Sequence, residues 1–289
     1  MKLTRLLIIS TMLSLLAACQ AGFMRSLKVP YAFSDYQKST LSYGSDKAQR
    51  LDVYRPTAAQ YQGKTLPVIV FFFGGSWRNG KRAWYEFFAA HYALKGYVVV
   101  VPDYRKAPNY IFPSFVEDAA ASVAYVRDNA AQLNVEPKRL YVMAHSAGAH
   151  IAALVMLDPQ YLQAKQMVPA DIKGFIGLSG PYDFLPMTDP LVVEVFKGDA
   201  NLPESQPINY AQFGAQAPPM LLIHGADDRL VYPKNSVNLA AKVNAAGGHA
   251  EVVVLPATGH VKTLFQAGRG LRGLAPEVDT RVLEFLARD

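Results

Sequence analysis

Residue types suited to nucleophilic catalysis follow three apolar segments of the chain. Residues 140–144 lead into Ser146, residues 220–224 lead into a pair of aspartates, and residues 252–255 lead into His260. A serine hydroxyl becomes an effective nucleophile only when a base removes its proton and an acid orients that base. The chain order serine, aspartate, histidine therefore predicts a catalytic triad for acyl transfer.

Ser146 stands where a strand-like segment gives way to an alanine-rich helical segment. A serine at such a sharp turn has strained dihedral angles, and the residues two before and two after it must be small so that the helix can approach the strand. Ala144 and Gly148 meet this requirement, although alanine replaces the usual first glycine. A helix N-cap serine is the alternative, but the strand, turn and helix context favours the nucleophile.

Two adjacent carboxylates, Asp227 and Asp228, compete for the role of the acid. The pattern H-G-x-x-D-x-x-V selects Asp228, which lies four residues after His224 and three before Val231. Asp227 is then a loop carboxylate. His260 follows the last apolar segment on an expected loop, and we predict that it is the base.

Acyl transfer also requires hydrogen-bond donors for the negative charge that develops on the substrate oxygen. Gly74 and Gly75 follow an apolar segment, and glycine allows the backbone to approach a substrate closely. We expect their N–H groups, with that of Ala147 just past the nucleophile, to form this oxyanion hole.

The remaining five histidines have structural explanations, and none pairs with carboxylates in a convincing metal site. His150 is the exception that we keep as a candidate substrate contact, because it lies one turn into the helix after Ser146. The predicted chemistry requires no metal and no organic cofactor.

The catalytic residues must be held at the ends of buried strands. Short apolar segments that read as parallel strands alternate with segments of helical periodicity, which predicts an α/β protein with a doubly wound sheet of about eight strands and helices on both faces. The expected strands are 68–73, 97–102, 140–144, 175–179, 220–224 and 252–255, with an edge hairpin of 41–43 and 51–54. The expected helices are 85–95, 114–129, 147–157 and 235–246. Residues 183–219 have no clear periodicity, and we interpret them as a small lid-like insertion or cap wall.

Several segments together resemble the esterase and lipase branch of the α/β-hydrolase fold, including hormone-sensitive-lipase-like, feruloyl-esterase-like and kynurenine-formamidase-like carboxylesterases. The resemblance runs from about Leu51 to His260 and rests on short motifs. These are Leu51-Asp52-Val53-Tyr54-Arg55-Pro56, Pro102-Asp103-Tyr104-Arg105-Lys106-Ala107-Pro108, Phe112-Pro113 with Asp118, and His145-Ser146-Ala147-Gly148-Ala149-His150.

The chain departs from that branch beside the predicted oxyanion hole. Phe73 stands where a histidine commonly opens an H-G-G motif, and Ser76 stands where many carboxylesterases have a third glycine. Phenylalanine cannot make the hydrogen bonds of an imidazole. Ser76 is a candidate backbone or hydroxyl donor, and Trp77 is a candidate wall of the acyl or alcohol pocket.

The resemblance implies a serine hydrolase of small-molecule carboxylic esters that works through an acyl-enzyme. An arylformamidase or amidase with the same triad is an alternative. A third alternative is a non-catalytic envelope lipoprotein on a hydrolase scaffold, because a fold does not guarantee an activity.

The N-terminus predicts export. Lys2 and Arg5 precede an apolar segment too short to span a bilayer comfortably, and Leu16-Ala17-Ala18-Cys19 resembles a bacterial lipobox around the chain's single cysteine. We expect a signal peptide over 1–18, lipidation of Cys19, a tether over 19–38 and a catalytic domain over 39–289. Membrane contact would be through the lipid anchor, as in a cell-envelope lipoprotein, and at the outer membrane if the source is Gram-negative.

Composition and charge restrict the other partners. The 289 residues are 51% hydrophobic and 18% charged, which is typical of a globular protein. The net charge of +6 falls to +4 without Lys2 and Arg5, and the basic residues are scattered rather than gathered in a stripe. We therefore expect no nucleic-acid partner. The sequence makes no prediction of oligomeric state.

Overall fold

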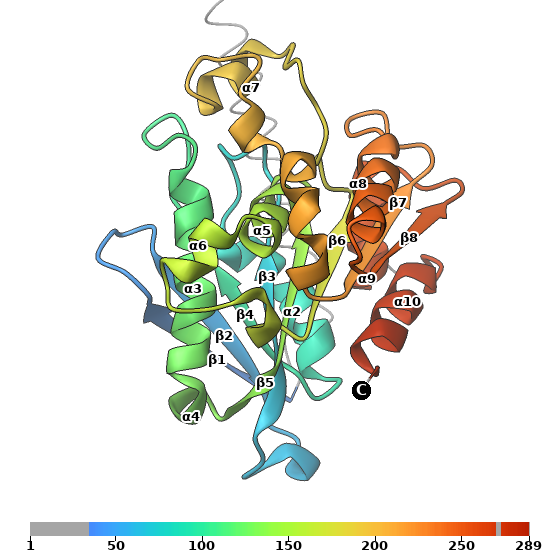
Figure 1. Ribbon diagram of the computed structural model, residues 1–289. Helices are drawn as coiled ribbons and strands as arrows, with labels where there is room; N and C mark the ends of the chain where they lie inside the picture. Colours follow the sequence, from blue (N-terminus) through green and yellow to red (C-terminus); the bar gives the residue numbers. More distant parts are fainter. Residues whose placement is uncertain (1–34, 270–272, 289) are drawn as a thin grey trace, which may run out of the picture.

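The computed structural model describes residues 35–269 and 273–288, which form one eight-stranded sheet flanked by helices (Figure 1). The strand order is β1-β2-β4-β3-β5-β6-β7-β8. β2 runs antiparallel to β1 and β4, and every other neighbouring pair is parallel. The strands are β1 (Tyr36–Ser42), β2 (Arg50–Pro56), β3 (Leu66–Phe72), β4 (Val98–Pro102), β5 (Val135–His145), β6 (Gly174–Leu178), β7 (Met220–Gly225) and β8 (Ala250–Leu255). The predicted doubly wound, mostly parallel sheet is confirmed.

The central strands consist of residues that fit a sheet buried on both faces. All residues of β3, β4, β6 and β7 are buried, and β4 reads Val-Val-Val-Val-Pro. Parallel strands between two helical layers have this continuous apolar character, because neither face meets water. Their carboxyl ends therefore form a rigid edge on which functional side chains can be placed.

The helices pack on both faces of the sheet. Figure 1 shows α3, α5 and α6 over one face, while α2 and α9 lie together on the other, where Phe87 meets Phe265 with ring centroids 5.8 Å apart. The α-helices are α2 (Glu86–Ala93), α3 (Ser114–Asp128), α4 (Ala130–Leu133), α5 (Ala147–Leu157), α6 (Pro159–Gln163), α7 (Pro190–Val195), α8 (Lys234–Ala245), α9 (His260–Ala267) and α10 (Glu277–Leu286). The four helices expected from periodicity correspond to α2, α3, α5 and α8.

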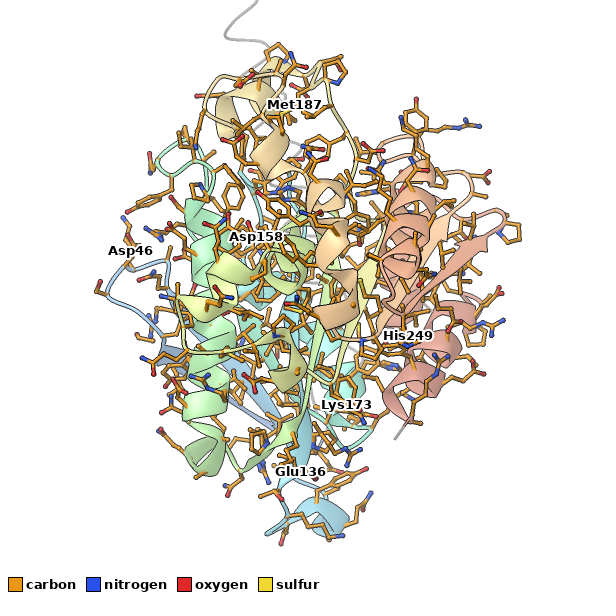
Figure 2. All side chains as sticks on the ribbon, viewed as in Figure 1. Asp46, Glu136, Asp158, Lys173, Met187 and His249 are labelled. Carbon is orange, nitrogen blue, oxygen red and sulfur yellow. The ribbon has the colours of Figure 1, made fainter. Side chains whose placement is uncertain are left out.

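The insertion between β6 and β7 is more regular than its sequence indicates. It contains α7 and the 3₁₀ segments η5 (Pro203–Ser205) and η6 (Pro207–Gln216). Figure 2 shows Met187 of this insertion at one end of the molecule, with Glu136 and Lys173 at the other. The insertion therefore stands over the carboxyl edge of the sheet.

The predicted N-terminal boundary of the domain needs correction. β1 begins at Tyr36, so a tether ending at residue 38 is too long. The sequence analysis placed only residues 41–43 of this edge strand in the hairpin with 51–54, because residues 37–40 are polar and exposed and so do not alternate with buried ones. The predicted signal peptide, Cys19 and the tether up to residue 34 lie outside the described residues and stay predictions. Within 35–269 and 273–288, no helix has the length and apolar character needed to cross a membrane.

Candidate active site

Ser146 occupies a strained turn between β5 and α5. Its φ of 55° and ψ of −127° are rarely adopted by residues other than glycine. A Cβ at Gly148 would lie 2.3 Å from the carbonyl oxygen of Phe72, so only glycine lets α5 approach β3 this closely. Ala144 is fully buried on the strand side. This geometry holds the serine side chain at the carboxyl edge of the sheet.

The structure brings Ser146, His260 and Asp228 together in one hydrogen-bonded chain. His260 Nδ1 lies 2.7 Å from Asp228 Oδ2, and His260 Nε2 lies 2.8 Å from Ser146 Oγ. Because a carboxylate only accepts hydrogen bonds, Nδ1 carries the proton and Nε2 accepts from the serine hydroxyl. His260 is the first residue of α9, whereas the sequence analysis placed it on a loop.

Asp228 is held as an ionised acceptor after β7. Its Oδ1 accepts hydrogen bonds from the N–H groups of Leu230 at 3.0 Å and Val231 at 2.9 Å. Burial alone would raise its pKa, but hydrogen bonds from His224, His260 and Val231 outweigh burial and hold the pKa of Asp228 well below its ordinary value.

His224 joins the Asp228 loop to α8 and was assigned no role from sequence. Its Nε2 donates to the carbonyl oxygen of Val231 at 2.8 Å and lies 3.3 Å from Asp228 Oδ2. Its Nδ1 lies 2.7 Å from Ser236 Oγ, which fixes the ring orientation. The side chain is fully buried, and its contacts hold the Asp228 carboxylate and the following loop in position.

His145 and Thr263 support the other end of the triad. His145 Nε2 donates to the backbone oxygen of His260 at 3.0 Å, and Thr263 Oγ1 donates to the same oxygen at 2.8 Å. Burial, with the nearby charge of His260, lowers the pKa of His145 to about 3, so His145 is neutral at physiological pH. Sequence reasoning missed both residues, because the His145 contact joins segments 115 positions apart and a threonine three residues after a histidine does not by itself indicate a site.

The loop after β3 passes directly beside the serine. A Cβ at Gly74 would lie 2.7 Å from Ser146 Cβ, and Gly75 has a φ of 135° that favours glycine. Within the part of the chain that the structure describes, the N–H groups of Gly74, Gly75, Ser76 and Ala147 make no hydrogen bond. Free backbone donors therefore surround the site where a substrate oxygen would sit.

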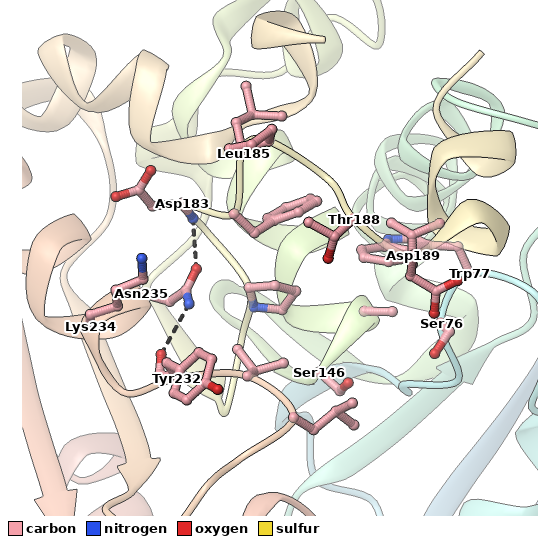
Figure 3. Close-up of a pocket in the computed structure, with 17 residues that line it drawn as sticks. Ser76, Trp77, Ser146, Asp183, Leu185, Thr188, Asp189, Tyr232, Lys234 and Asn235 are labelled. Carbon is pink, nitrogen blue, oxygen red and sulfur yellow. Dashed lines mark hydrogen bonds between the residues drawn. The ribbon is translucent and has the colours of Figure 1, made fainter. Parts of the chain in front are cut away.

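Two cavities open on either side of Ser146. The larger has a volume of about 350 Å³ and includes Ala147 but not His260; the smaller has about 240 Å³ and includes His260 but not Ala147. Ser76 lines both. Figure 3 shows Ser76 and Trp77 on one side of Ser146, across the larger cavity from Lys234.

The linings of the two cavities differ in chemistry. The larger cavity combines aromatic with polar and charged side chains from the loop after β3, the insertion and the segment that leads into α8, among them Trp77, Phe184, Tyr232, Asp183, Lys234 and Asn235. The smaller cavity is closed mainly by apolar side chains of the helical layer, among them Tyr85, Val261, Leu264 and Phe265.

His150 does not line either cavity, which corrects its candidate place as a substrate contact. Its ring is fully buried, its Nδ1 accepts from Trp77 Nε1 at 3.1 Å, and its Nε2 donates to the carbonyl oxygen of Ser205 at 2.7 Å. Burial lowers its pKa to about 4. The residue thus fixes the Trp77 ring and joins α5 to the insertion.

Asp227 and His249 lie apart from the constellation. Asp227 is exposed beside its buried neighbour Asp228, and His249 precedes β8 at the amino end of the sheet. Among residues 35–269 and 273–288, no group of histidine, cysteine and acidic side chains is arranged to hold a metal ion.

A mostly parallel sheet with a strained serine after its central strand, and an aspartate and a histidine at the same edge, defines the α/β-hydrolase class. Structural comparison supports this assignment. Esterase B from Lactobacillus rhamnosis superposes with a TM-score of 0.76 at 21% identity and covers 96% of each chain. Within the class, the BD-FAE family model matches residues 51–243, and the chain belongs to that family.

Curated relatives are similar over most of this chain. An isoprenylcysteine α-carbonyl methylesterase from Arabidopsis thaliana is 28% identical over 264 residues, which are 85% of this chain and 61% of the relative. Esterase LipC from Mycobacterium tuberculosis is 29% identical over 253 residues, which are 78% of this chain and 60% of the relative. The chain thus spans about 60% of the length of these two relatives.

Proposed function

We propose that the protein hydrolyses carboxylic esters through a covalent acyl-enzyme. The observation that carries this proposal is the hydrogen-bonded chain from Ser146 Oγ through the His260 ring to Asp228, with distances of 2.8 and 2.7 Å. Ser146 Oγ, where this hydrogen-bonded series ends, lies beside free backbone N–H groups. It also lies between two cavities that can receive the two halves of an ester.

In the first half of the reaction, Ser146 Oγ attacks the ester carbonyl carbon while its proton passes to His260 Nε2. Asp228 stabilises the resulting imidazolium, and the carbonyl oxygen becomes an oxyanion. Collapse of this tetrahedral intermediate breaks the bond to the leaving alcohol, which takes the proton from His260 Nε2. The acyl group then remains on Ser146.

In the second half, a water molecule repeats the sequence. His260 takes a proton from the water as its oxygen attacks the acyl carbon, and the same proton returns to Ser146 Oγ when the ester bond to the enzyme breaks. Backbone N–H groups of the loop at Gly74 and Gly75, together with that of Ala147, stabilise the oxyanion in both halves.

The position of His260 supports one assignment of the acyl and alcohol groups to the two cavities. The leaving oxygen must reach His260 Nε2, so the alcohol belongs in the smaller cavity that this histidine lines, and the acyl group belongs in the larger one. The smaller cavity, of about 240 Å³, suits a short or apolar alcohol. The larger cavity suits an acyl group that carries a ring and polar substituents, because both aromatic and polar side chains line it.

Substrate comparison tests this function. We expect the full chain to hydrolyse methyl 3-phenylpropanoate and related methyl esters, and Ser146→Ala to lower kcat/KM by at least about 10³-fold. Ser122→Ala is a suitable control, since Ser122 is a buried serine of α3 whose hydroxyl donates to the carbonyl oxygen of Ala119. N-formylkynurenine and the matching amide complete the panel.

Three results of this experiment would count against the proposal. A folded wild-type protein that hydrolyses none of the esters would contradict it, as would Ser146→Ala with wild-type turnover. Faster turnover of the formamide than of every ester would reassign the protein as a formamidase with the same triad.

A further inference from the structure

An aromatic stack stands behind the oxyanion loop at the position where the sequence departs from related esterases. The Phe73 ring lies between the rings of Tyr85 and Tyr104, with centroid distances of 5.0 and 4.9 Å and interplanar angles of 12° and 26°. Lys106 Nζ lies 5.3 Å from the Phe73 centroid and 4.6 Å from that of Tyr104. We call Phe73, Tyr85 and Tyr104 the aromatic clamp.

The two tyrosine hydroxyls of the clamp reach the backbone of the loop. Tyr104 Oη donates to the carbonyl oxygen of Phe73 at 2.9 Å, and Tyr85 Oη donates more weakly to that of Gly74 at 3.5 Å. Both tyrosines are buried, and burial raises the pKa of each phenol, so both keep the proton they donate. These bonds hold two successive peptide planes.

The orientation of each carbonyl determines the orientation of the next N–H group. In a trans peptide the C=O and N–H bonds point in opposite directions. Holding the oxygens of residues 73 and 74 therefore sets the directions of the N–H groups of Gly74 and Gly75. The following peptide is held from within the loop, since Arg78 and Asn79 donate to the carbonyl oxygen of Gly75 at 3.1 and 2.8 Å.

Further contacts fix the position of the aromatic clamp. Lys106 Nζ donates to the carbonyl oxygen of Tyr104 at 2.9 Å, and the N–H group of Ala107 donates to that of Trp77 at 3.1 Å. A Cβ at Gly80 would lie 2.7 Å from the Phe73 ring, so the turn that closes the loop packs directly on the clamp. The Phe73 ring therefore has a fixed position, and so do the two peptides that follow Phe73 and Gly74.

We propose that Tyr104, assisted by Tyr85 and stacked on Phe73, is a positioning residue for the oxyanion hole. The inference rests on the proposed ester hydrolysis. The aromatic clamp holds the N–H groups of Gly74 and Gly75 in place before substrate binds. It thereby replaces the hydrogen bonds that a histidine at position 73 would make. Tyr104 contacts no substrate in this account and acts only through the backbone.

The test compares Tyr104→Phe with the wild type in three measurements on the full chain. We expect kcat for a methyl ester to fall about 10- to 100-fold, because a small misplacement of catalytic groups has an effect of this size. The inhibition constant of phenylboronic acid, which forms a tetrahedral adduct on the serine, should rise by the same factor, while KM stays within about 2-fold. Tyr85→Phe should show the same pattern at about 3-fold, because its bond is longer.

Tyr141→Phe is the matched control for loss of a buried tyrosine hydroxyl. Tyr141 donates to the carbonyl oxygen of Leu286 at 3.2 Å, on α10 and away from the loop. It should lower Tm as Tyr104→Phe does and leave kcat unchanged. If Tyr104→Phe does not fold, Tyr85→Phe decides the question by the inhibition constant of phenylboronic acid, which places no alcohol in the smaller cavity that Tyr85 lines.

Different experimental results would contradict the role of the aromatic clamp and the proposed ester hydrolysis. If wild-type protein is active and Tyr104→Phe lowers kcat no more than Tyr141→Phe, or raises KM while the boronic acid affinity is unchanged, the clamp has no positioning role. If wild-type protein and every variant lack activity, the proposed function itself is wrong.

Discussion

At the scale of single residues, the contrast between Asp227 and Asp228 shows how environment selects an acid. The two are chemically identical neighbours, yet Asp228 is 1% exposed and accepts from two backbone N–H groups and a histidine, whereas Asp227 is exposed. The spacing pattern in the sequence selects the same residue. The structure supplies the physical reason. The turn after Asp228 holds one carboxylate oxygen by two backbone N–H groups and leaves the other within hydrogen-bond distance of His260.

Separate substitutions of Asp227 and Asp228 test whether the environment of Asp228 makes it the acid of the triad. Asp228→Asn should lower kcat by about 10⁴-fold, because an amide can present its N–H group to His260 and stabilise the wrong tautomer. Asp227→Asn removes the same charge from the adjacent position and should leave kcat within about 2-fold. Steady-state kinetics on one methyl ester measure both effects. Equal losses in the two variants would show that Asp228 is not the acid.

Other residues of the site could not be found from the sequence at this scale. The contacts of His224 with Val231 and of Thr263 with His260 are local, but these residue types at these spacings do not by themselves indicate a supporting role. His145 and Tyr104 are recognised only by contacts between distant segments, such as that of His145 with the His260 carbonyl oxygen, 115 positions away. A single chain carries no signal for such pairs. Ser146 and His260, in contrast, stand directly after apolar strands, and that adjacency is visible in the sequence.

At the scale of elements, the buried strands and the helix after Ser146 were predictable because continuous apolar segments mark strands covered on both faces. The bounds of α5 agree with the prediction over 147–157. The first residues of β1 and the helices inside the insertion over 183–219 were not predictable. β1 is a polar edge strand, and the insertion is held by tertiary contacts, including the packing of Phe184 and Phe196 against Trp77 at 5.9 and 4.9 Å.

At the scale of the whole molecule, two buried histidines couple stability to pH. The pKa is lowered to about 3 for His145 and to about 4 for His150, against an ordinary value of 6.5. Below pH 6.5 the unfolded chain therefore binds protons that the folded chain excludes. Stability is complete above that pH and is lost as the pH falls toward the folded-state values.

The free energy of unfolding should fall by about 2 to 3 kcal/mol between pH 7.5 and pH 5.5, or about 1.4 kcal/mol for each histidine. Urea denaturation at the two pH values measures this difference. His150→Gln should remove about half of it, even though the variant is less stable at both. Stability that is equal at pH 7.5 and 5.5 would show that the folded protein accommodates these protons.

The central claim for the molecule is that Ser146 is the activated nucleophile of an esterase. Intact-mass analysis after treatment with a fluorophosphonate tests it most directly, because such probes form a stable covalent adduct with activated serines. We predict one adduct per chain, located at Ser146 by peptide mapping, and none in Ser146→Ala. An adduct on another residue, or undiminished labelling of Ser146→Ala, would contradict the claim.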